Sequence, residues 1–221
     1  AVQSDTDEGA LSRRFATNSG SRMTFQNPRK ADHPASPFFV DRWSPRAYTG
    51  EEISDADLNR IFEAARWAPS AYNAQPWRFL YAKRGAPEFE KFLSIVNDGN
   101  RTWAKNASVL MVLVSRKLIR PPGADKDAPS RSHSLDAGAA WAYLALEASI
   151  LGWPAHAMIG IDFEKARREL NVPDDFHVEM AIALGRRGDK AMLSEALQAR
   201  ETPNPRNPTA HFAISGGFPE T

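Results

Sequence analysis

The stretch Val109-Leu-Met-Val-Leu-Val114 decides the fold, because every side chain in it is apolar. A strand that is apolar on both faces needs cover on both faces, so this run predicts the central strand of a sheet between two layers. Two further strands are predicted. Trp77, Phe79 and Tyr81 alternate with their neighbours at the two-residue period of a strand, and the segment from Val178 to Leu184 indicates another.

The spacing of apolar residues predicts helices on both sides of the Trp77 strand. Ser54 is the predicted N-cap of the first, with acidic residues in the first turn. Its apolar face consists of Leu58, Ile61, Phe62 and Ala65. Ala68 precedes Pro69, which disfavours further helix, so the chain is expected to turn there. The second helix carries Phe89, Phe92, Leu93 and Val96, and Asp98-Gly99 is expected to stop it.

Three more helices are predicted in the second half of the chain. Ser134 to Leu151, closed by Gly152, is apolar nearly all round, so its own domain or a second subunit has to cover it. Asp162 is expected to cap a helix whose inward residues are Phe163, Ala166 and Leu170. Another helix is expected from beyond Gly185 to about Ala199. The mixture of helices and strands predicts the α+β (mixed α/β) class.

Composition limits the number of domains and the classes of partner. The 221 residues, 42% hydrophobic, suffice for one domain with a core. We predict a flexible N-terminal extension over residues 1–36 and a folded domain over 37–221, which ends in a Pro-rich arm. A net charge of +1 gives no general attraction to nucleic acid, and no run is apolar for long enough to span a membrane. The absence of cysteine excludes disulfides and thiolate sites, and it fits a cytoplasmic location.

Two segments before the central strand could contact a ligand. Arg42, Ser44 and Arg46 place two guanidinium groups and a hydroxyl in one short stretch, which suits phosphate recognition but equally a solvated basic patch. The loop Ala68-Pro-Ser-Ala-Tyr-Asn-Ala-Gln-Pro-Trp77 offers two side-chain amides among small residues that let a flat ring approach. Its alternative interpretation is a simple connector between a helix and a strand.

Three further positions carry weaker signals. Asn100 could offer its amide to a heterocycle, or it is a turn residue. Gly160 permits close approach of its backbone to a ligand. Arg206 is a lone cation of the Pro-rich arm, for which exposure to solvent is the alternative. Tyr72 and Trp103 are candidates for the walls of an acceptor pocket, or for packing in the core.

Taken in order, these segments resemble the nitroreductase family of flavoproteins. The series is R-W-S-P-R, then A-P-S-A-Y-N-A-Q-P-W, then G-N-R-T-W, the apolar helix and M-I-G, and finally E-T-P-N-P-R, from about Phe38 to Phe218. The resemblance implies a central, mostly antiparallel sheet flanked by helices, with an extended C-terminal arm. It also implies an FMN-dependent oxidoreductase that uses NAD(P)H as electron donor and reduces nitroaromatics or quinones by a ping-pong mechanism. A homodimer with FMN at the subunit interface is the implied assembly.

The resemblance also implies which residues bind the cofactor. Arg42, Ser44 and Arg46, with Trp43 between them, match positions that hold the FMN phosphate and ribityl chain. Arg206 matches an arginine of the arm that reaches the phosphate. The other matched positions pack along the flavin, contact it or lie over its ring: Pro69, Ser70, Ala71, Asn100, Met158, Ile159 and Gly160. Asn73, also counted with the cofactor site, matches an asparagine that supports the loop rather than touching the ring. Pro69, Ser70 and Ala71 match a loop that packs along the flavin of the partner subunit.

Two positions depart from the family pattern. Ile159 stands where some relatives have an acidic residue, and Pro205 stands where some have a second basic residue. No catalytic acid or base is predicted, because the flavin supplies the chemistry. A metal site is not expected, because the histidines lack the paired spacing of a metal-binding motif. The alternatives are a related flavin reaction, such as flavin breakdown or dehalogenation, a flavin-binding protein with little turnover, and an anion-binding module.

Overall fold

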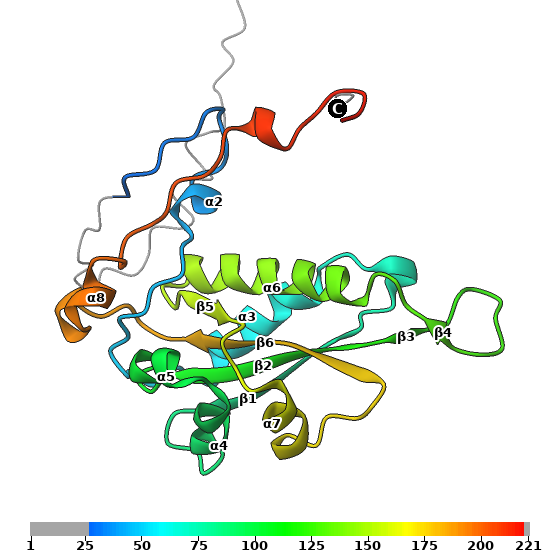
Figure 1. Cartoon of the computed structure of the whole chain (residues 1–221), viewed down its shortest axis with the longest axis horizontal. Helices are drawn as coiled ribbons and strands as arrows, with labels where there is room; N and C mark the ends of the chain where they lie inside the picture. Colours follow the sequence, from blue (N-terminus) through cyan, green and yellow to red (C-terminus); the bar gives the residue numbers. More distant parts are fainter. Residues whose placement is uncertain (1–26, 219–221) are drawn as a thin grey trace, which may run out of the picture.

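The computed structural model describes residues 27–218, so positions 1–26 of the predicted extension lie outside the described residues. Its centre is a four-stranded sheet in the order β1-β2-β6-β5, with every neighbouring pair antiparallel (Figure 1). The strands are β1 (Trp77–Lys83), β2 (Val109–Arg116), β5 (Ala155–Met158) and β6 (Phe176–Leu184). Because β2 pairs with a strand on each side, the central strand predicted from Val109–Val114 is confirmed.

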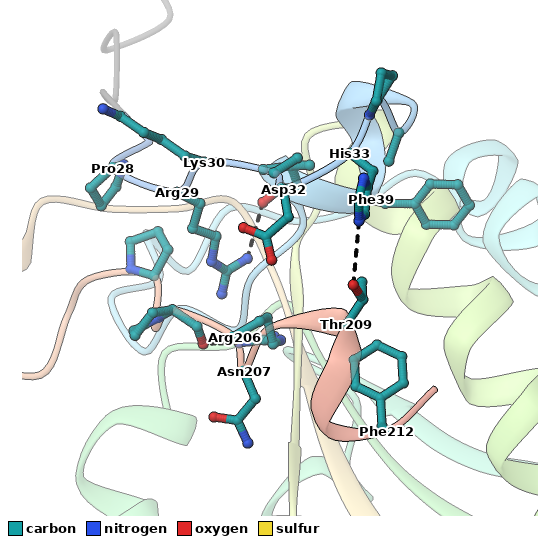
Figure 2. Close-up of a pocket in the computed structure, with 16 residues that line it drawn as sticks. Pro28, Arg29, Lys30, Asp32, His33, Phe39, Arg206, Asn207, Thr209 and Phe212 are labelled. Atoms are coloured by element: carbon teal, nitrogen blue, oxygen red, sulfur yellow. Dashed lines mark hydrogen bonds between the residues drawn. The ribbon is translucent and has the colours of Figure 1, made fainter. Parts of the chain in front are cut away.

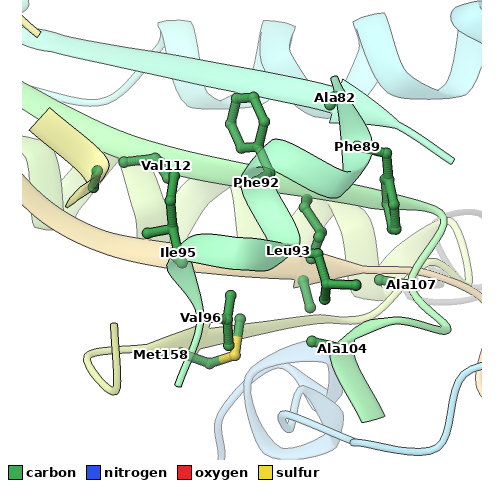
Figure 3. Packing of buried hydrophobic residues seen from close by; sticks show 14 of the residues in the cluster. Ala82, Phe89, Phe92, Leu93, Ile95, Val96, Ala104, Ala107, Val112 and Met158 are labelled. Atoms are coloured by element: carbon green, nitrogen blue, oxygen red, sulfur yellow. The ribbon is translucent and has the colours of Figure 1, made fainter. Parts of the chain in front are cut away.

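Alternate residues of β2 face two separate hydrophobic clusters. Val109, Met111 and Leu113 pack in a cluster with the helices above the sheet in Figure 1. Leu110, Val112 and Val114 pack in the opposite cluster, shown in Figure 3. The upper layer contains α3 (Asp55–Arg66) and α6 (His133–Ile150), and the lower layer contains α4 (Phe89–Ile95) and α7 (Phe163–Glu169). Each fully buried large aliphatic side chain contributes about 1.5–3 kcal/mol, so β2 holds both layers together.

The two helices of the upper layer follow their predicted patterns. The Ser54 side chain accepts a hydrogen bond from the Asp57 backbone N–H, which caps α3. Leu58, Ile61 and Ala65 are buried beneath it. On α6, the side chains of Leu135 and Tyr143 are 77% and 41% exposed. The described part of the chain therefore leaves some of this apolar helix exposed.

The predicted helix stop at Asp98-Gly99 is wrong. Helix α4 already ends at Ile95, and Asp98 begins a new helix, α5 (Asp98–Ala104). The Asn97 side chain accepts a hydrogen bond from the Asn100 N–H and so caps α5. This cap, together with burial of Trp103, offsets the roughly 1 kcal/mol that a glycine costs inside a helix.

Two expectations for the second half of the chain also fail. The helix expected up to Ala199 is replaced by two short turns, η2 (Lys190–Met192) and α8 (Glu195–Gln198). Leu193 between them has an extended backbone and a buried side chain, so tertiary packing overrides helix propensity there. On α7, Ala166 is fully buried, but Phe163 is 40% exposed rather than inward.

Both ends of the described chain leave the sheet on the same side (Figure 1). The N-terminal segment (27–36) runs beside the C-terminal arm (200–218), and Arg29 Nε donates to the Asn204 carbonyl across 2.7 Å. The minor elements are α2 (Pro37–Asp41), η1 (Ala71–Asn73), β3 (Leu118–Ile119), β4 (Ala128–Pro129) and η3 (Thr209–His211). Among the residues described, no helix combines the length and apolar character needed to cross a membrane.

Candidate functional site

A basic cavity of about 430 Å³, here called the inner cavity, lies where the segment after α2 meets the C-terminal arm. Arg42, Ser44 and Arg46 line it, together with Trp43 and Arg206. Arg42 donates to the Ser44 hydroxyl across 3.2 Å, so the two side chains form one wall. Residues far apart in the sequence thus gather guanidinium groups and a hydroxyl around a single space.

Glu201 fixes the base of the inner cavity. One of its carboxylate oxygens accepts hydrogen bonds from the backbone N–H groups of Arg46 and Ala47, at 2.7 and 2.9 Å. The other oxygen lies 3.6 Å from the Arg46 guanidinium. The side chain is buried, so the charge-assisted hydrogen bonds to the two N–H groups are strong, and they join the arm to the irregular segment around Arg46.

The remaining arginines of the inner cavity repel one another. Burial lowers the pKa of the Arg42 guanidinium, and the nearby charges of Arg29 and Arg206 lower it further. The pKa of Arg29 is lowered by burial and by Arg206, and is partly restored by Asp41. Cations that destabilise one another in this way create a positive potential that an anion relieves. The arrangement can therefore bind a phosphate or another small dianion.

His156 connects the inner cavity to the core. Its Nδ1–H donates to the Pro45 carbonyl across 3.0 Å, and its ring lies on Trp103 with centroids 4.7 Å apart. Burial lowers the pKa of His156 to about 4, against the hydrogen bond to Pro45 and with help from the charge of Arg46. His156 is therefore neutral at neutral pH and adds no cation to the cavity.

Trp103 is almost completely buried, so of its two interpretations the packing one is confirmed.

A second group, the amide cluster, consists of Asn97, Asn100 and Gly160. The Asn97 N–H donates to the Gly160 carbonyl across 3.0 Å, and the Asn97 side chain caps the helix that carries Asn100. A Cβ on Gly160 would lie only 2.4 Å from Asn97 Nδ2 and 2.7 Å from Asn100 Nδ2. A side chain at position 160 would therefore displace these amides. Next to it, Met158 is buried while Ile159 is 77% exposed.

The third predicted group, the loop 69–75, does not line the inner cavity. Tyr72, Asn73 and Gln75 adopt left-handed backbone angles, with φ of 51°, 54° and 47°. Such angles are costly for residues other than glycine, so local contacts have to hold the loop. The Ser70 hydroxyl accepts from the Gln75 N–H, and the buried Asp136 carboxylate accepts from the Ala71 N–H across 3.2 Å. Tyr72 is 68% exposed.

Several residues of the site were not predicted. Arg29, His156 and Arg200 line the inner cavity, Glu201 fixes its base, Asn97 belongs to the amide cluster and Asp136 anchors the loop 69–75. Asn97 carries a usable signal, because asparagine before an acidic first turn is typical of a helix N-cap. Arg29 carries none, since it lies in a polar segment without periodicity. The assignment of all these residues to a cofactor stays a prediction.

Comparisons with known proteins agree with one another. Residues 40–99 match a family model described as the nitroreductase family. A putative NADH dehydrogenase/NAD(P)H nitroreductase of Streptomyces coelicolor is 29% identical over 177 residues, covering 72% of this chain and 85% of that protein. A solved structure described as an oxidoreductase containing FMN is 43% identical, with a TM-score of 0.84, over 90% of this chain and 100% of that chain. A putative nitroreductase in complex with FMN from Desulfovibrio desulfuricans is 25% identical, with a TM-score of 0.63, over 86% and 100%. The predicted α+β fold, an antiparallel sheet flanked by helices, is that of these structures.

Proposed function

The chain belongs to the nitroreductase family, and from this we propose that it is an FMN-dependent oxidoreductase that moves electrons from NAD(P)H to small, electron-poor acceptors such as nitroaromatics and quinones. The observation that supports it most is the inner cavity, which joins Arg42, Ser44, Arg46 and Arg206. Two of the most similar solved structures are described as containing FMN. We extend that cofactor to this chain as part of the proposal.

The residues of the inner cavity fit the phosphate end of FMN. A phosphate monoester carries nearly two negative charges, and paired guanidinium N–H groups match its oxygens. Arg42 and Arg206 provide such groups without a carboxylate that neutralises them, whereas Arg46 is oriented by Glu201. The Ser44 hydroxyl can donate to a further oxygen while it accepts from Arg42. We assign Arg42, Trp43, Ser44, Arg46 and Arg206 to this end of the cofactor.

The amide cluster fits the edge of a flat ring. Asn100 offers amide groups, and the glycine at 160 lets the backbone approach closely. Ile159 leaves its apolar side chain exposed beside them, as suits a residue that lies over a ring. We therefore assign Asn100, Met158, Ile159 and Gly160 to the ring end of the cofactor.

When bound, FMN would supply the redox chemistry by taking a hydride from NAD(P)H and passing electrons to the acceptor. The side chains named here hold and orient, and none of them is needed as an acid or base.

Donor and acceptor are both flat and are expected to occupy the same open space in turn. That order gives ping-pong kinetics, in which the oxidised nicotinamide leaves before the acceptor enters. The sequence and the fold offer no dinucleotide-binding motif, so the proposal covers NADH and NADPH alike. The cytoplasmic location is retained in the proposal on the cysteine-free composition alone.

We also propose a homodimer with FMN at its interface. The loop 69–75 and the inner cavity lie apart within one chain, although both are assigned to the flavin. A second copy would bring its own Pro69, Ser70, Ala71 and Asn73 to the cofactor. Leu135 and Tyr143 on α6 present exposed apolar surface that such a copy would cover. On this proposal, residues 37–221 form the FMN-binding domain.

The visible absorption spectrum of the purified protein tests this proposal. We expect flavin bands that bleach when NADH or NADPH is added without oxygen and that return when a nitroaromatic or a quinone follows. Flavin that binds but does not bleach would leave a flavin-binding protein with little turnover or a specialised relative. A colourless protein that cannot be reconstituted with FMN would contradict the proposal and would leave an anion-binding module.

A further inference from the structure

Arg29 connects three parts of the chain at the edge of the inner cavity. Its Nη1 donates to the carbonyls of Val40 and Arg42, at 3.0 and 2.8 Å, and its Nε donates to the Asn204 carbonyl. Figure 2 shows its side chain reaching from the N-terminal segment toward the arm, where Arg206 lies. Arg29 and Asn204 are 175 positions apart in the sequence. One guanidinium group therefore joins the start of the described chain to its end.

The hydrogen bonds of Arg29 fix the backbone that carries two cations of the cavity, Arg42 and Arg206. It binds the backbone carbonyl of Arg42 itself, and it binds Asn204, two positions before Arg206. Arg206 in turn donates to the Asn204 carbonyl across 3.3 Å. A change at Arg29 would therefore loosen both sides of the cavity at once, although Arg29 belongs to neither side.

The charge of Arg29 is left available to a ligand. Within residues 27–218, its Nη2 makes no hydrogen bond, and the side chain lines the inner cavity. The nearest acidic partner, Asp41, accepts a hydrogen bond from Asn27 across 2.9 Å. The Glu201 carboxylate is paired with the Arg46 guanidinium and accepts hydrogen bonds from backbone N–H groups. Three guanidinium groups, of Arg29, Arg42 and Arg206, thus share a positive field that the charge of Asp41 offsets only in part.

We propose that Arg29 is a binding and positioning residue for the phosphate of the cofactor, and that the N-terminal segment is a strap whose docking is coupled to phosphate binding. This inference rests on the proposed function and assigns to the site a segment that the sequence places outside the folded domain. Coupling of this kind is reciprocal: if the docked strap strengthens phosphate binding, then bound phosphate holds the strap in place by the same factor.

The first test compares two neutral substitutions of adjacent cations in the full-length, flavin-free chain. Arg29→Gln removes the charge and the connections between segments, whereas Lys30→Gln removes an exposed charge that lines only the outer cavity of about 840 Å³. Titration of flavin fluorescence gives the dissociation constants for FMN and for riboflavin, which lacks the phosphate. Arg29→Gln is expected to weaken FMN about tenfold or more and to leave riboflavin within about twofold. Lys30→Gln is expected to change neither.

Two outcomes of this titration would overturn the inference. An Arg29→Gln variant that binds FMN like the unmodified chain would show that the residue is not part of the phosphate site. Equal weakening of FMN and riboflavin would show a general structural role only. If the unmodified chain does not bind FMN, the proposed function itself fails, so the two failures are distinguishable.

A second test needs no variant and so does not depend on folding of the mutant. Trypsin cleavage after the exposed Lys30 is followed in the unmodified chain without ligand, with FMN and with riboflavin. FMN is expected to slow this cleavage about tenfold, riboflavin is expected to leave it unchanged, and cleavage after the exposed Lys126 serves as the internal reference. A rate at Lys30 that FMN does not alter would overturn the coupling.

Discussion

The inner cavity and the amide cluster are built in opposite ways. The cations of the cavity belong to extended segments from both ends of the chain, which are joined by hydrogen bonds from side chains to backbone carbonyls. Asn100 lies on α5, and Gly160 follows β5, beside the hydrophobic core that buries Met158. Charges act over several ångströms and tolerate small displacements, whereas amide contacts require fixed positions. Under the proposed function, the cavity would supply affinity for the cofactor and the cluster would supply its orientation.

The largest effect is expected from removal of both predicted phosphate ligands of the cavity. Arg42→Ala combined with Arg46→Ala removes two charge-assisted interactions of about 1.5–3 kcal/mol each, so FMN binding should weaken more than about a hundredfold. The flavin-to-protein ratio after purification measures this. Arg60→Ala with Arg66→Ala, which removes two exposed arginines of α3, is the matched control. Undiminished flavin in the first variant would show that affinity does not come from the cavity.

The amide cluster is tested by Gly160→Ala. The new Cβ would displace Asn97 and Asn100, and overpacking of this kind costs about 1–3 kcal/mol of folding stability. We expect a lower melting temperature and shifted flavin absorption bands, with the bound FMN retained. Gly138→Ala in α6 is the control, because nothing lies within 4 Å of its Cβ and alanine is the better helix former. Loss of FMN with unshifted bands would reverse the roles assigned to the two regions.

His156, between the two regions, predicts a pH dependence of stability. Its folded pKa of about 4 lies below its ordinary value of 6.5, so between these values the unfolded chain binds a proton that the folded chain does not. The stabilising contribution is complete above pH 6.5 and is lost as the pH falls toward 4, by at most about 1.4 kcal/mol per pH unit. Urea unfolding of the flavin-free protein at pH 7 and pH 5 measures it. His156→Gln should flatten the difference, and an unchanged difference would assign it to other groups.

The smallest effect is expected in the loop 69–75, which belongs to neither region. Asp136→Asn keeps an oxygen for the Ala71 N–H but removes the charge that strengthens the bond and suits the first turn of α6. The free energy of unfolding should fall by about 1 kcal/mol, and the Ala71 amide should exchange faster with solvent. The matched control is Asp98→Asn in the first turn of α5, which is exposed and contacts only Arg101. Exchange at Ala71 that does not respond would show that the loop is held by its own hydrogen bonds.

The sequence predicts what periodicity and capping determine. The apolar run at Val109–Val114 predicts the central strand, and Ser54 and Asp162 cap helices as predicted. Two helix boundaries fail for physical reasons. Asn97 restarts a helix where Asp98-Gly99 indicates a stop, and the buried Leu193 holds an extended conformation in a stretch of good helix formers. The Asn97 cap is a local signal that the prediction missed, whereas the conformation at Leu193 depends on contacts outside the local sequence window.

The same distinction between sequence signals and tertiary contacts applies to the residues of the predicted site. Arg42, Ser44, Arg46 and Arg206 were named from a resemblance, and the structure brings them together. Arg29 and Glu201 escape prediction because their roles arise only in the fold, where Arg29 meets the arm and Glu201 of the arm meets the backbone of Arg46 and Ala47. The loop 69–75 does not line the cavity.

The hydrogen bonds of Arg29 also imply an order in which the sheet and the anion site form during synthesis. All four strands of the sheet end by Leu184, whereas the cavity needs Glu201, Asn204 and Arg206 as well. A nascent chain can therefore collapse around β2 before its anion site exists. Closure of that site pairs residue 29 with residue 204, a contact of very long sequence separation that forms late. Only a chain whose synthesis has passed the arm therefore contains all the residues of the anion site.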